Sequence, residues 1–145
     1  LSGFSVDAVC GPLVEGAFVA LMVASELDVE FYYTERFERE SDHLFPVEYR
    51  IPDAQRARVQ GKRLAIVNDV VNAGSAVRGT LADLQTCGAE PVAIGTLLVL
   101  GEAAARYAAE KNIPLISIAT LPNHLWTPME CPLCASGSPV ENLAE

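Results

Sequence analysis

Small and polar residues follow a short apolar run near the middle of the chain, and their spacing is typical of an anion-binding turn. Residues 64–67 read Leu-Ala-Ile-Val, which predicts a strand buried on both faces. Asn68 and Asp69 come next, and a turn around Gly74 leads into a helix predicted to begin near Ala76. The free N–H groups of such a turn and the positive end of the helix favour a bound phosphate. An ordinary strand–turn–helix connection with a solvated polar turn is the alternative.

Asp69 has a different role in this arrangement, because a carboxylate repels a phosphate. Beside an anion-binding turn it is better suited to accept hydrogen bonds from sugar hydroxyls, or to hold a magnesium ion that accompanies the phosphate. The residue types therefore favour a phosphate-bearing ligand with a sugar or a metal ion close to Asp69.

This stretch resembles the phosphoribosyl diphosphate (PRPP) signature of the type I phosphoribosyltransferases, and most of all its orotate version. The family signature has an apolar run, two acids, two apolar residues and a small-residue loop around a glycine. Asn68 stands where the first acid is usual, and Asn72 and Ser75 stand where threonines are common. The resemblance implies a catalytic role for Asp69, a Mg²⁺ cofactor and a PRPP site formed by Asn68, Asp69, Val70, Val71, Asn72, Ala73, Gly74, Ser75 and Ala76.

The same resemblance implies transfer of ribose-5-phosphate from PRPP to a nitrogenous base of the orotate type, with release of pyrophosphate. A catalytically weak module that binds PRPP or a nucleotide is the alternative. Glu102 favours that alternative, because Gly101-Glu102 stands where orotate enzymes carry an arginine for the orotate carboxylate. Either another arginine such as Arg78 takes that role, or the base is not orotate. Glu102 is also explained as a first-turn residue that complements a helix dipole.

A turn after the first predicted strand stands where the family keeps its pyrophosphate loop, which implies that role for Gly11, Pro12, Leu13, Val14, Glu15 and Gly16. Its glycines allow the backbone to approach an anion closely. Glu15 opposes this reading, because its carboxylate repels pyrophosphate unless it points away or binds the metal. A plain strand-to-helix turn is the other interpretation.

A charged segment near residues 35–48 matches, by position, the flexible catalytic lid of the family. The resemblance implies that Arg36 and Arg39 clamp the leaving pyrophosphate and that His43 neutralises or protonates it. In the family this lid commonly closes over the neighbouring subunit, so a homodimer is expected. The segment contains no lysine, and a solvated loop of mixed charge is the alternative.

Four cysteines are present, and two of them form a Cys-x-x-Cys pair at Cys131 and Cys134. One such pair supplies half of a tetrahedral zinc site, which His124 or a second chain would have to complete. A redox pair is another possibility, although the pair does not follow a strand as in thioredoxin-like proteins. A reduced structural turn is the favoured interpretation of the three.

Composition excludes some functions and bounds others. The 145 residues carry a formal net charge of −9 with only two lysines, which excludes the basic face that nucleic acids require. No apolar run approaches the roughly 20 residues of a membrane span, and no secretory leader is recognisable. We therefore expect a cytoplasmic protein with reduced cysteines. Because the chain starts at Leu1, we expect an N-terminal hood segment of the orotate-type enzymes to be missing.

The elements that must position these residues alternate between strands and helices. The patterns predict an α/β protein with an open, mostly parallel sheet flanked by helices, as in a type I phosphoribosyltransferase core. Ligands of such sheets bind at the carboxyl ends of the strands. The core is expected over residues 1–121 and a tail over 122–145. Predicted strands span residues 6–10, 30–34, 45–51, 64–67, 92–100 and 115–118, and predicted helices span 16–27, 76–86 and 102–112.

Overall fold

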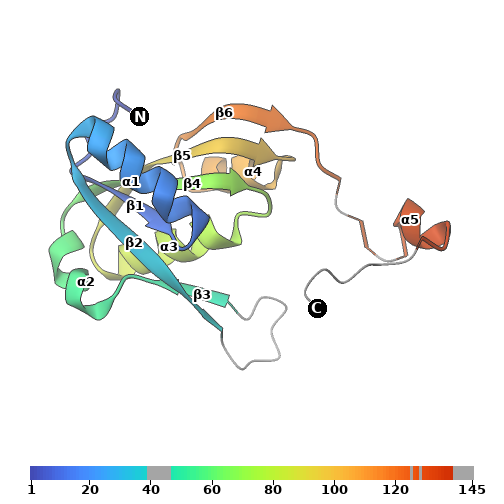
Figure 1. Ribbon diagram of the computed structural model, residues 1–145, viewed down its shortest axis with the longest axis horizontal. Coiled ribbons are helices and arrows are strands. Elements are labelled where there is room, and N and C mark those ends of the chain that lie inside the picture. Colours follow the sequence, from blue (N-terminus) through green and yellow to red (C-terminus); the bar gives the residue numbers. More distant parts are fainter. Residues whose placement is uncertain (39–46, 125, 128, 139–145) are drawn as a thin grey trace.

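The computed structural model describes residues 1–38, 47–124, 126–127 and 129–138, which form a six-stranded sheet with helices on both faces (Figure 1). The strands are β1 (Ala8–Pro12), β2 (Glu30–Glu38), β3 (Val47–Arg50), β4 (Arg63–Val71), β5 (Glu90–Leu100) and β6 (Leu115–Leu121). The helices are α1 (Glu15–Leu27), α2 (Asp53–Val59), α3 (Ser75–Thr86), α4 (Ala103–Glu110) and α5 (Pro132–Ala135).

The strand order is β3-β2-β1-β4-β5-β6, and every neighbouring pair is parallel except β2 with β3. This confirms the predicted α/β fold with an open, mostly parallel sheet. Strand β1 has β2 as its neighbour on one edge, and the chain later returns to place β4 on the other edge of β1. The order of the strands therefore reverses between β1 and β4, which is where open α/β sheets place their ligands.

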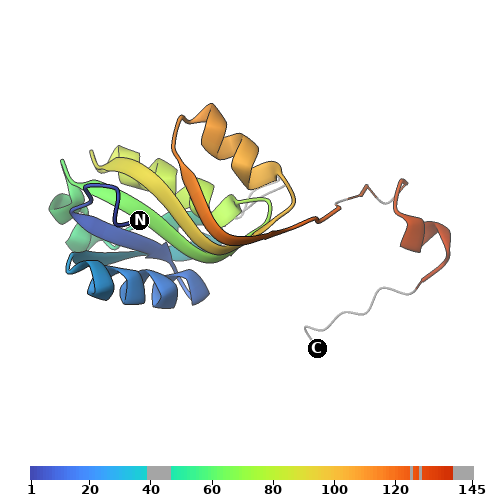
Figure 2. The ribbon, with the colours of Figure 1, turned by 90° about the horizontal axis from the view of Figure 1, so that it is seen from above.

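Two apolar layers lie on opposite faces of the sheet, and Figure 2 shows α1 on one face with α3 and α4 on the other. Val9, Ala65 and Val67 pack toward α1, where Ala20 and Ala24 are also buried. The opposite layer is larger and contains buried residues of α3 and α4 together with alternate residues of the strands: Ala8, Cys10, Leu64, Ile66, Val77, Leu81, Leu84, Ile94, Ala104 and Ala108. This two-sided burial explains the near-continuous apolar runs of the strands.

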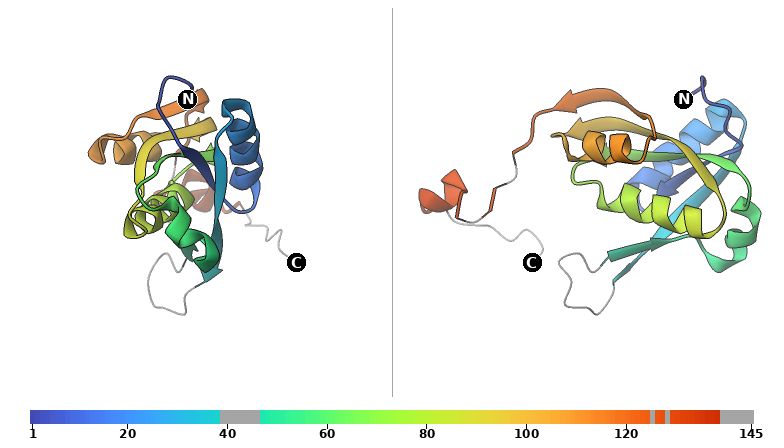
Figure 3. Two further views of the ribbon diagram at one scale, coloured as in Figure 1. Left: turned by 90° about the vertical axis from the view of Figure 1, so that its left-hand side faces the viewer. Right: turned by 180° about the vertical axis from the view of Figure 1, so that it is seen from behind.

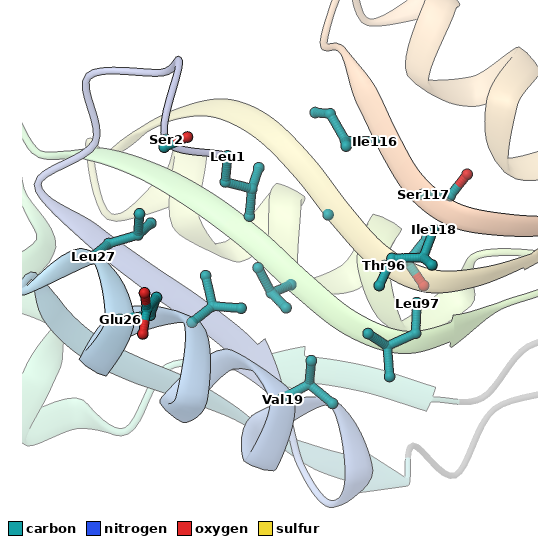
Figure 4. A pocket seen from close by; sticks show the side chains of 13 residues that line it. Leu1, Ser2, Val19, Glu26, Leu27, Thr96, Leu97, Ile116, Ser117 and Ile118 are labelled. Atoms are coloured by element: carbon teal, nitrogen blue, oxygen red, sulfur yellow. The ribbon is translucent and has the colours of Figure 1, made fainter.

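Side chains do not fill all of the space between α1 and the sheet. On the α1 side, a hollow of about 500 Å³ lies between α1 and the sheet face formed by β4, β5 and β6. Figure 4 shows Val19 from the helix and Leu97, Ile116 and Ile118 from the strands around it. Ile118 and Leu97 are exposed, so part of this sheet face lacks a covering layer among the described residues.

The structure corrects the sequence prediction between residues 35 and 61. That segment was expected to be largely irregular, with a short returning strand. In the structure, β2 continues to Glu38, β3 pairs with it as a hairpin, and α2 follows. Figure 3 shows this hairpin running beyond the other strands. Arg36 and Arg50 of the hairpin are exposed, so the buried-strand pattern does not apply there.

Helix α2 was missed because it is short and buries only Val59. An ion pair fixes it to α3, with Arg56 Nη1 3.0 Å from Asp83 Oδ2. Asp83 also accepts a hydrogen bond of 2.7 Å from the main-chain N–H of Ile51. Long-range contacts of this kind leave no periodic signal in the sequence. Across the described residues, no helix has the length and apolar character needed to cross a bilayer.

Candidate phosphate-binding site

The carboxyl end of β4 and the beginning of α3 enclose a hollow of about 280 Å³. Its lining contains Asn68 and every residue from Val70 to Ala76. All of these residues belong to the stretch that sequence analysis selected for PRPP, so the structure brings nearly all of that stretch around one cavity. We call this cavity the phosphate hollow.

Helix α3 begins at the edge of the phosphate hollow. Gly74 is its N-cap residue and has a φ of 82°, a conformation that glycine adopts without steric cost. The first helical hydrogen bond runs from the N–H of Arg78 to the carbonyl of Gly74, at 2.8 Å. The preceding N–H groups, including those of Ser75 and Ala76, have no acceptor within the helix. They supply the donors and the positive dipole end that a phosphate requires.

Strand β4 does not end at Val67, as its apolar pattern suggested, but continues to Val71. Leu64 and Ile66 face the α3 layer, and Val71 faces the same layer although it is an odd number of positions further along. The alternation of side chains therefore shifts by one residue between Val67 and Val71. Asn68 and Asp69 lie within this shift.

Side chains satisfy the main chain at this irregular point. Asn68 is buried, and its Nδ2 donates to the carbonyl of Val70 at 3.0 Å. Thr96 Oγ1, on the neighbouring strand β5, donates to the carbonyl of Asp69 at 2.8 Å. These bonds fix the direction in which residues 68–70 present their side chains.

Asp69 is half-buried; its chain neighbours Asn68 and Val70 line the phosphate hollow, but Asp69 itself does not. Within the described ranges, its carboxylate has no hydrogen-bond or ion-pair partner, in contrast to the carboxylates of Asp83 and Glu30. A carboxylate that is fixed by its backbone but not engaged by a protein donor remains available to a hydroxyl or a cation.

The turn predicted as a pyrophosphate loop lies directly against Asn68. A Cβ atom added to Gly16 would lie 2.2 Å from Asn68 Oδ1, so only glycine leaves room for that side chain. The structure thus places the loop between β1 and α1 next to the end of β4. The Leu13–Val14 peptide bond in this loop is cis, and Glu15 is exposed at the start of α1.

The boundaries of this turn differ from the prediction. The first strand was expected to end at Cys10, but Gly11 and Pro12 are part of β1 and pair with Tyr33 and Thr34. A Cβ atom on Gly11 would lie 2.6 Å from the Cβ of Ala20. The glycine is therefore needed for close packing of α1 on the strand, and the exposed part of the turn is shorter than predicted.

The predicted lid is only partly within the described residues. Arg36, expected in a loop, lies on β2 opposite Tyr49 of β3, because the hairpin pairing extends over it. Arg39 and His43 lie outside the described residues. The structure therefore corrects the start of the lid, at residues 35–38, from loop to strand, whereas residues 47–48 lie in the strand expected at 45–51.

A second hollow, of about 400 Å³, adjoins the first at the carboxyl ends of β5 and β6. Asn72 lines both hollows, and its Oδ1 accepts a hydrogen bond of 3.0 Å from Asn123 Nδ2. Arg106 and Glu102 of the α4 region lie on its wall, with Arg106 Nη2 3.7 Å from Glu102 Oε2. We call this cavity the side hollow.

Sequence analysis missed Arg106 and Asn123, and it offered Arg78 as the replacement arginine. In the structure, the Arg78 guanidinium lies 4.4 Å from the centre of the Tyr107 ring. The Arg78 side chain of α3 therefore packs against Tyr107 of α4, whereas Arg106 lines the side hollow. The spacing of Glu102 and Arg106, one helical turn apart, was a visible signal for this pair.

The cysteines form no metal site within the described part of the chain, where no cluster of three or more His, Cys, Asp or Glu side chains has metal-binding geometry. Cys10 is fully buried, which raises the pKa of its thiol, and burial also raises the pKa of Cys87. Cys131 and Cys134 lie at the start and end of the turn of helix α5.

An open, mostly parallel sheet with a hollow beside a helix N-terminus at its switch point is typical of nucleotide- and sugar-phosphate-binding α/β proteins. Comparison with known families identifies the member of this class: the model of the phosphoribosyl transferase domain matches residues 2–126. The chain belongs to the phosphoribosyltransferase family, as its resemblance to the type I enzymes had indicated.

Curated relatives include an orotate phosphoribosyltransferase of Caldanaerobacter subterraneus subsp. tengcongensis, which is 26% identical over 95% of this chain and 66% of its own length. One from Nitratiruptor sp. is 28% identical over 94% of this chain and 68% of its own length. The chain therefore spans about two thirds of the length of these relatives.

Solved structures show the same fold at lower identity. An adenine phosphoribosyltransferase from Thermoanaerobacter pseudethanolicus superimposes with a TM-score of 0.67 at 20% identity, covering 82% of this chain and 72% of its own. An orotate phosphoribosyltransferase from Aeropyrum pernix gives 0.63 at 23% identity, with coverages of 81% and 62%. An adenine enzyme from Trypanosoma brucei, solved with AMP, pyrophosphate and ribose-5-phosphate, gives 0.64 at 16% identity, with coverages of 96% and 63%.

Proposed function

We propose that this protein transfers ribose-5-phosphate from PRPP to a nitrogenous base of the orotate type and releases pyrophosphate. The observation that carries the proposal is the phosphate hollow, where residues 72–76 surround about 280 Å³ at the N-terminal end of α3. The helix N–H groups would bind the 5′-phosphate, and Asp69 beside them would hold the ribose hydroxyls. The T. brucei relative, with ribose-5-phosphate and pyrophosphate bound, supports the same ligand class.

Mg²⁺ fits this arrangement as a cofactor that travels with the substrate. Magnesium is commonly bound through one or two carboxylates together with substrate phosphates. Asp69, next to Asn68 in the chain, is the carboxylate that would hold the metal, and the neutral amide of Asn68 brings no charge. The metal would neutralise the pyrophosphate and so compensate for the negative net charge of the chain.

The side hollow is the proposed position of the acceptor base, because it shares Asn72 with the phosphate hollow. An acceptor carboxylate would compete with Glu102 for the Arg106 guanidinium. Arg106→Ala should raise the KM for orotate about tenfold, the value of one charge-assisted hydrogen bond, with little change in the KM for PRPP. Equal effects on both substrates would place the base elsewhere.

The direct test of the proposed reaction uses Ser75→Glu, which puts a carboxylate into the phosphate hollow and should abolish PRPP binding by calorimetry. Gln85→Glu, which adds the same charge on the exposed face of α3 near its other end, should bind PRPP as the unaltered chain does. PRPP binding that survives Ser75→Glu would overturn the proposed phosphate site. Nucleotide formation is then measured with orotate, uracil and purines.

A second candidate function is a regulatory module that binds PRPP without turnover. It is favoured by Asn68, whose amide hydrogen-bonds to the Val70 carbonyl in the place of the usual acid. Calorimetric binding of PRPP without product from any of these bases would select this function over the enzyme.

The expected homodimer also belongs to the proposal. Helix α1 carries a stripe of exposed apolar side chains, comprising Val14 just before it and Phe18, Leu21 and Met22 within it. A helical stripe of this size is typical of a face that a second subunit covers.

A further inference from the structure

The tail of the chain contains a chemical site that transfer of ribose-5-phosphate does not use. Cys131 is the N-cap residue of α5, Pro132 follows as its first residue, and Cys134 lies three positions after Cys131. Residues three apart on one helical turn lie side by side on the same face. Their Cα atoms are then within the range that a disulfide bridges.

Main-chain hydrogen bonds hold the turn that carries Cys131 and Cys134. Main-chain hydrogen bonds of 3.0 Å from Ala135 to Cys131 and from Ser136 to Pro132 close it. Proline fixes φ where the turn begins, and its missing N–H is not needed there. The two side chains, three positions apart on this closed turn, lie on the same side of it.

The two thiols also differ from each other and from the remaining cysteines. Main-chain N–H groups of Cys134 and Leu133 donate to the Cys131 sulfur and lower its pKa, while the hydrogen bond from Cys134 to Cys131 raises the pKa of Cys134. A nucleophilic thiol beside a protonated one is the arrangement of a thiol–disulfide exchange pair. Cys10, by contrast, is buried and its thiol pKa is raised.

Access and stoichiometry favour exchange over metal binding. Figure 1 shows α5 standing apart from the sheet, and Cys134 is exposed. Within the described residues no third ligand accompanies the pair, so the described part of one chain does not supply a tetrahedral zinc site. A disulfide needs only the two sulfur atoms that the turn provides.

We propose that Cys131 and Cys134 form a thiol–disulfide exchange site whose substrate is the disulfide of a small thiol or of an exposed protein cysteine. The Cys131 thiolate attacks one sulfur of that disulfide, the S–S bond breaks, and one thiolate leaves. The Cys134 thiolate then attacks the Cys131 sulfur of the mixed disulfide and releases the second thiol. Two cysteines of this chain are oxidised, and one disulfide is reduced to two thiols.

Oxidised glutathione is the probe for this proposal, used on the full chain with denaturing alkylation and peptide mass mapping. The number of free thiols should fall from four to two, with the new disulfide joining Cys131 and Cys134, and dithiothreitol should reverse the change. Cys134→Ser should accumulate a mixed disulfide on Cys131, whereas Cys131→Ser should leave Cys134 largely unmodified. Cys87→Ser is the matched control and should form the disulfide as the unaltered chain does.

Three outcomes would overturn the proposal of a thiol–disulfide exchange site. The first is that no thiols are lost at glutathione ratios that oxidise ordinary exchange pairs. The second is a disulfide that links two chains instead of closing within one. The third is zinc retained at one ion per two chains after purification without added metal, which would assign the pair to a shared Cys₄ centre.

Discussion

At the scale of single residues, Asn68 connects the two loops of the proposed site. Its Nδ2 donates to the carbonyl of Val70, and its Oδ1 lies close to Gly16 in the loop between β1 and α1. The acid that the family usually carries at this position would place a carboxylate oxygen against the Val70 carbonyl. The packing around residue 68 is therefore suited to asparagine and not to the acid that is usual in the family.

Asn68→Asp should therefore lower the free energy of unfolding by about 1–3 kcal/mol, because the Val70 carbonyl loses its donor and faces a second acceptor. Urea denaturation measures the change. Asn72→Asp is the matched control, since its Oδ1 only accepts a hydrogen bond from Asn123 and a carboxylate still does so. Equal stability of the two variants would show that the Asn68 amide is not required.

Tyr32 offers a pH-dependent test of a second residue-scale contact. Its side chain is buried, its hydroxyl donates to Glu30, and burial together with this bond raises the tyrosine pKa to about 12. Unfolded tyrosine ionises near pH 10, so the unfolded chain loses this proton first. The contribution of Tyr32 to stability is present below pH 10 and is lost as the pH rises toward 12.

The loss should amount to about 2 kcal/mol, after some allowance for solvent at the hydroxyl. Denaturant unfolding is measured between pH 9 and pH 12 for the unaltered chain, for Tyr32→Phe and for the control Tyr33→Phe, which lies on the same strand. Tyr32→Phe should flatten the alkaline decline and Tyr33→Phe should not. A decline that is identical in all three proteins would assign it to other groups.

At the scale of elements, the sequence was sufficient where local signals dominate. The apolar runs of β4 and β5 predicted buried parallel strands, and the helix predicted over residues 76–86 is α3, within one residue at its start. The signal failed where tertiary contacts decide the structure. Helix α2 depends on the Arg56–Asp83 ion pair, and the outer half of β2 depends on pairing with β3.

The candidate site shows the same division between local and long-range information. The loop from Asn68 to Ala76 is contiguous in the chain, so its residue types were enough to predict a hollow there. Arg106 and Asn123 reach the side hollow from α4 and from the segment after β6. Their approach to Asn72 depends on the order of the strands, which periodicity does not give.

The Asn123–Asn72 hydrogen bond connects the segment after β6 to the phosphate hollow, and its effect on ligand binding can be measured. Asn123→Ala should weaken PRPP binding two- to fivefold, or about 0.5–1 kcal/mol, because residue 72 would then be held in place only by its backbone. Calorimetry with PRPP gives the dissociation constant. Thr120→Ala, which removes a 3.5 Å contact with the Ser117 hydroxyl within β6, should leave the dissociation constant unchanged. An unaltered constant for Asn123→Ala would exclude a positioning role.

At the scale of the whole molecule, the two apolar faces are unequal. The layer between the sheet and helices α3 and α4 holds the larger buried cluster, whereas α1 leaves Phe18 65% exposed and Met22 72% exposed. Across the described residues, the hollow beside α1 continues this apolar surface onto β5 and β6. Because the net charge of −9 keeps chains apart at long range, association must come from such short-range apolar burial.

Phe18→Glu should therefore convert the proposed dimer to a monomer, since burying an unpaired carboxylate in an apolar interface costs several kcal/mol. Sedimentation velocity at several concentrations measures the change in assembly. Gln85→Glu is the control for charge alone, because it adds a carboxylate to an exposed face of α3. A monomer in the unaltered chain, or a dimer that persists in Phe18→Glu, would exclude this face as the subunit contact. If the lid of one subunit serves the other, the Phe18→Glu monomer should also retain PRPP binding but lose turnover.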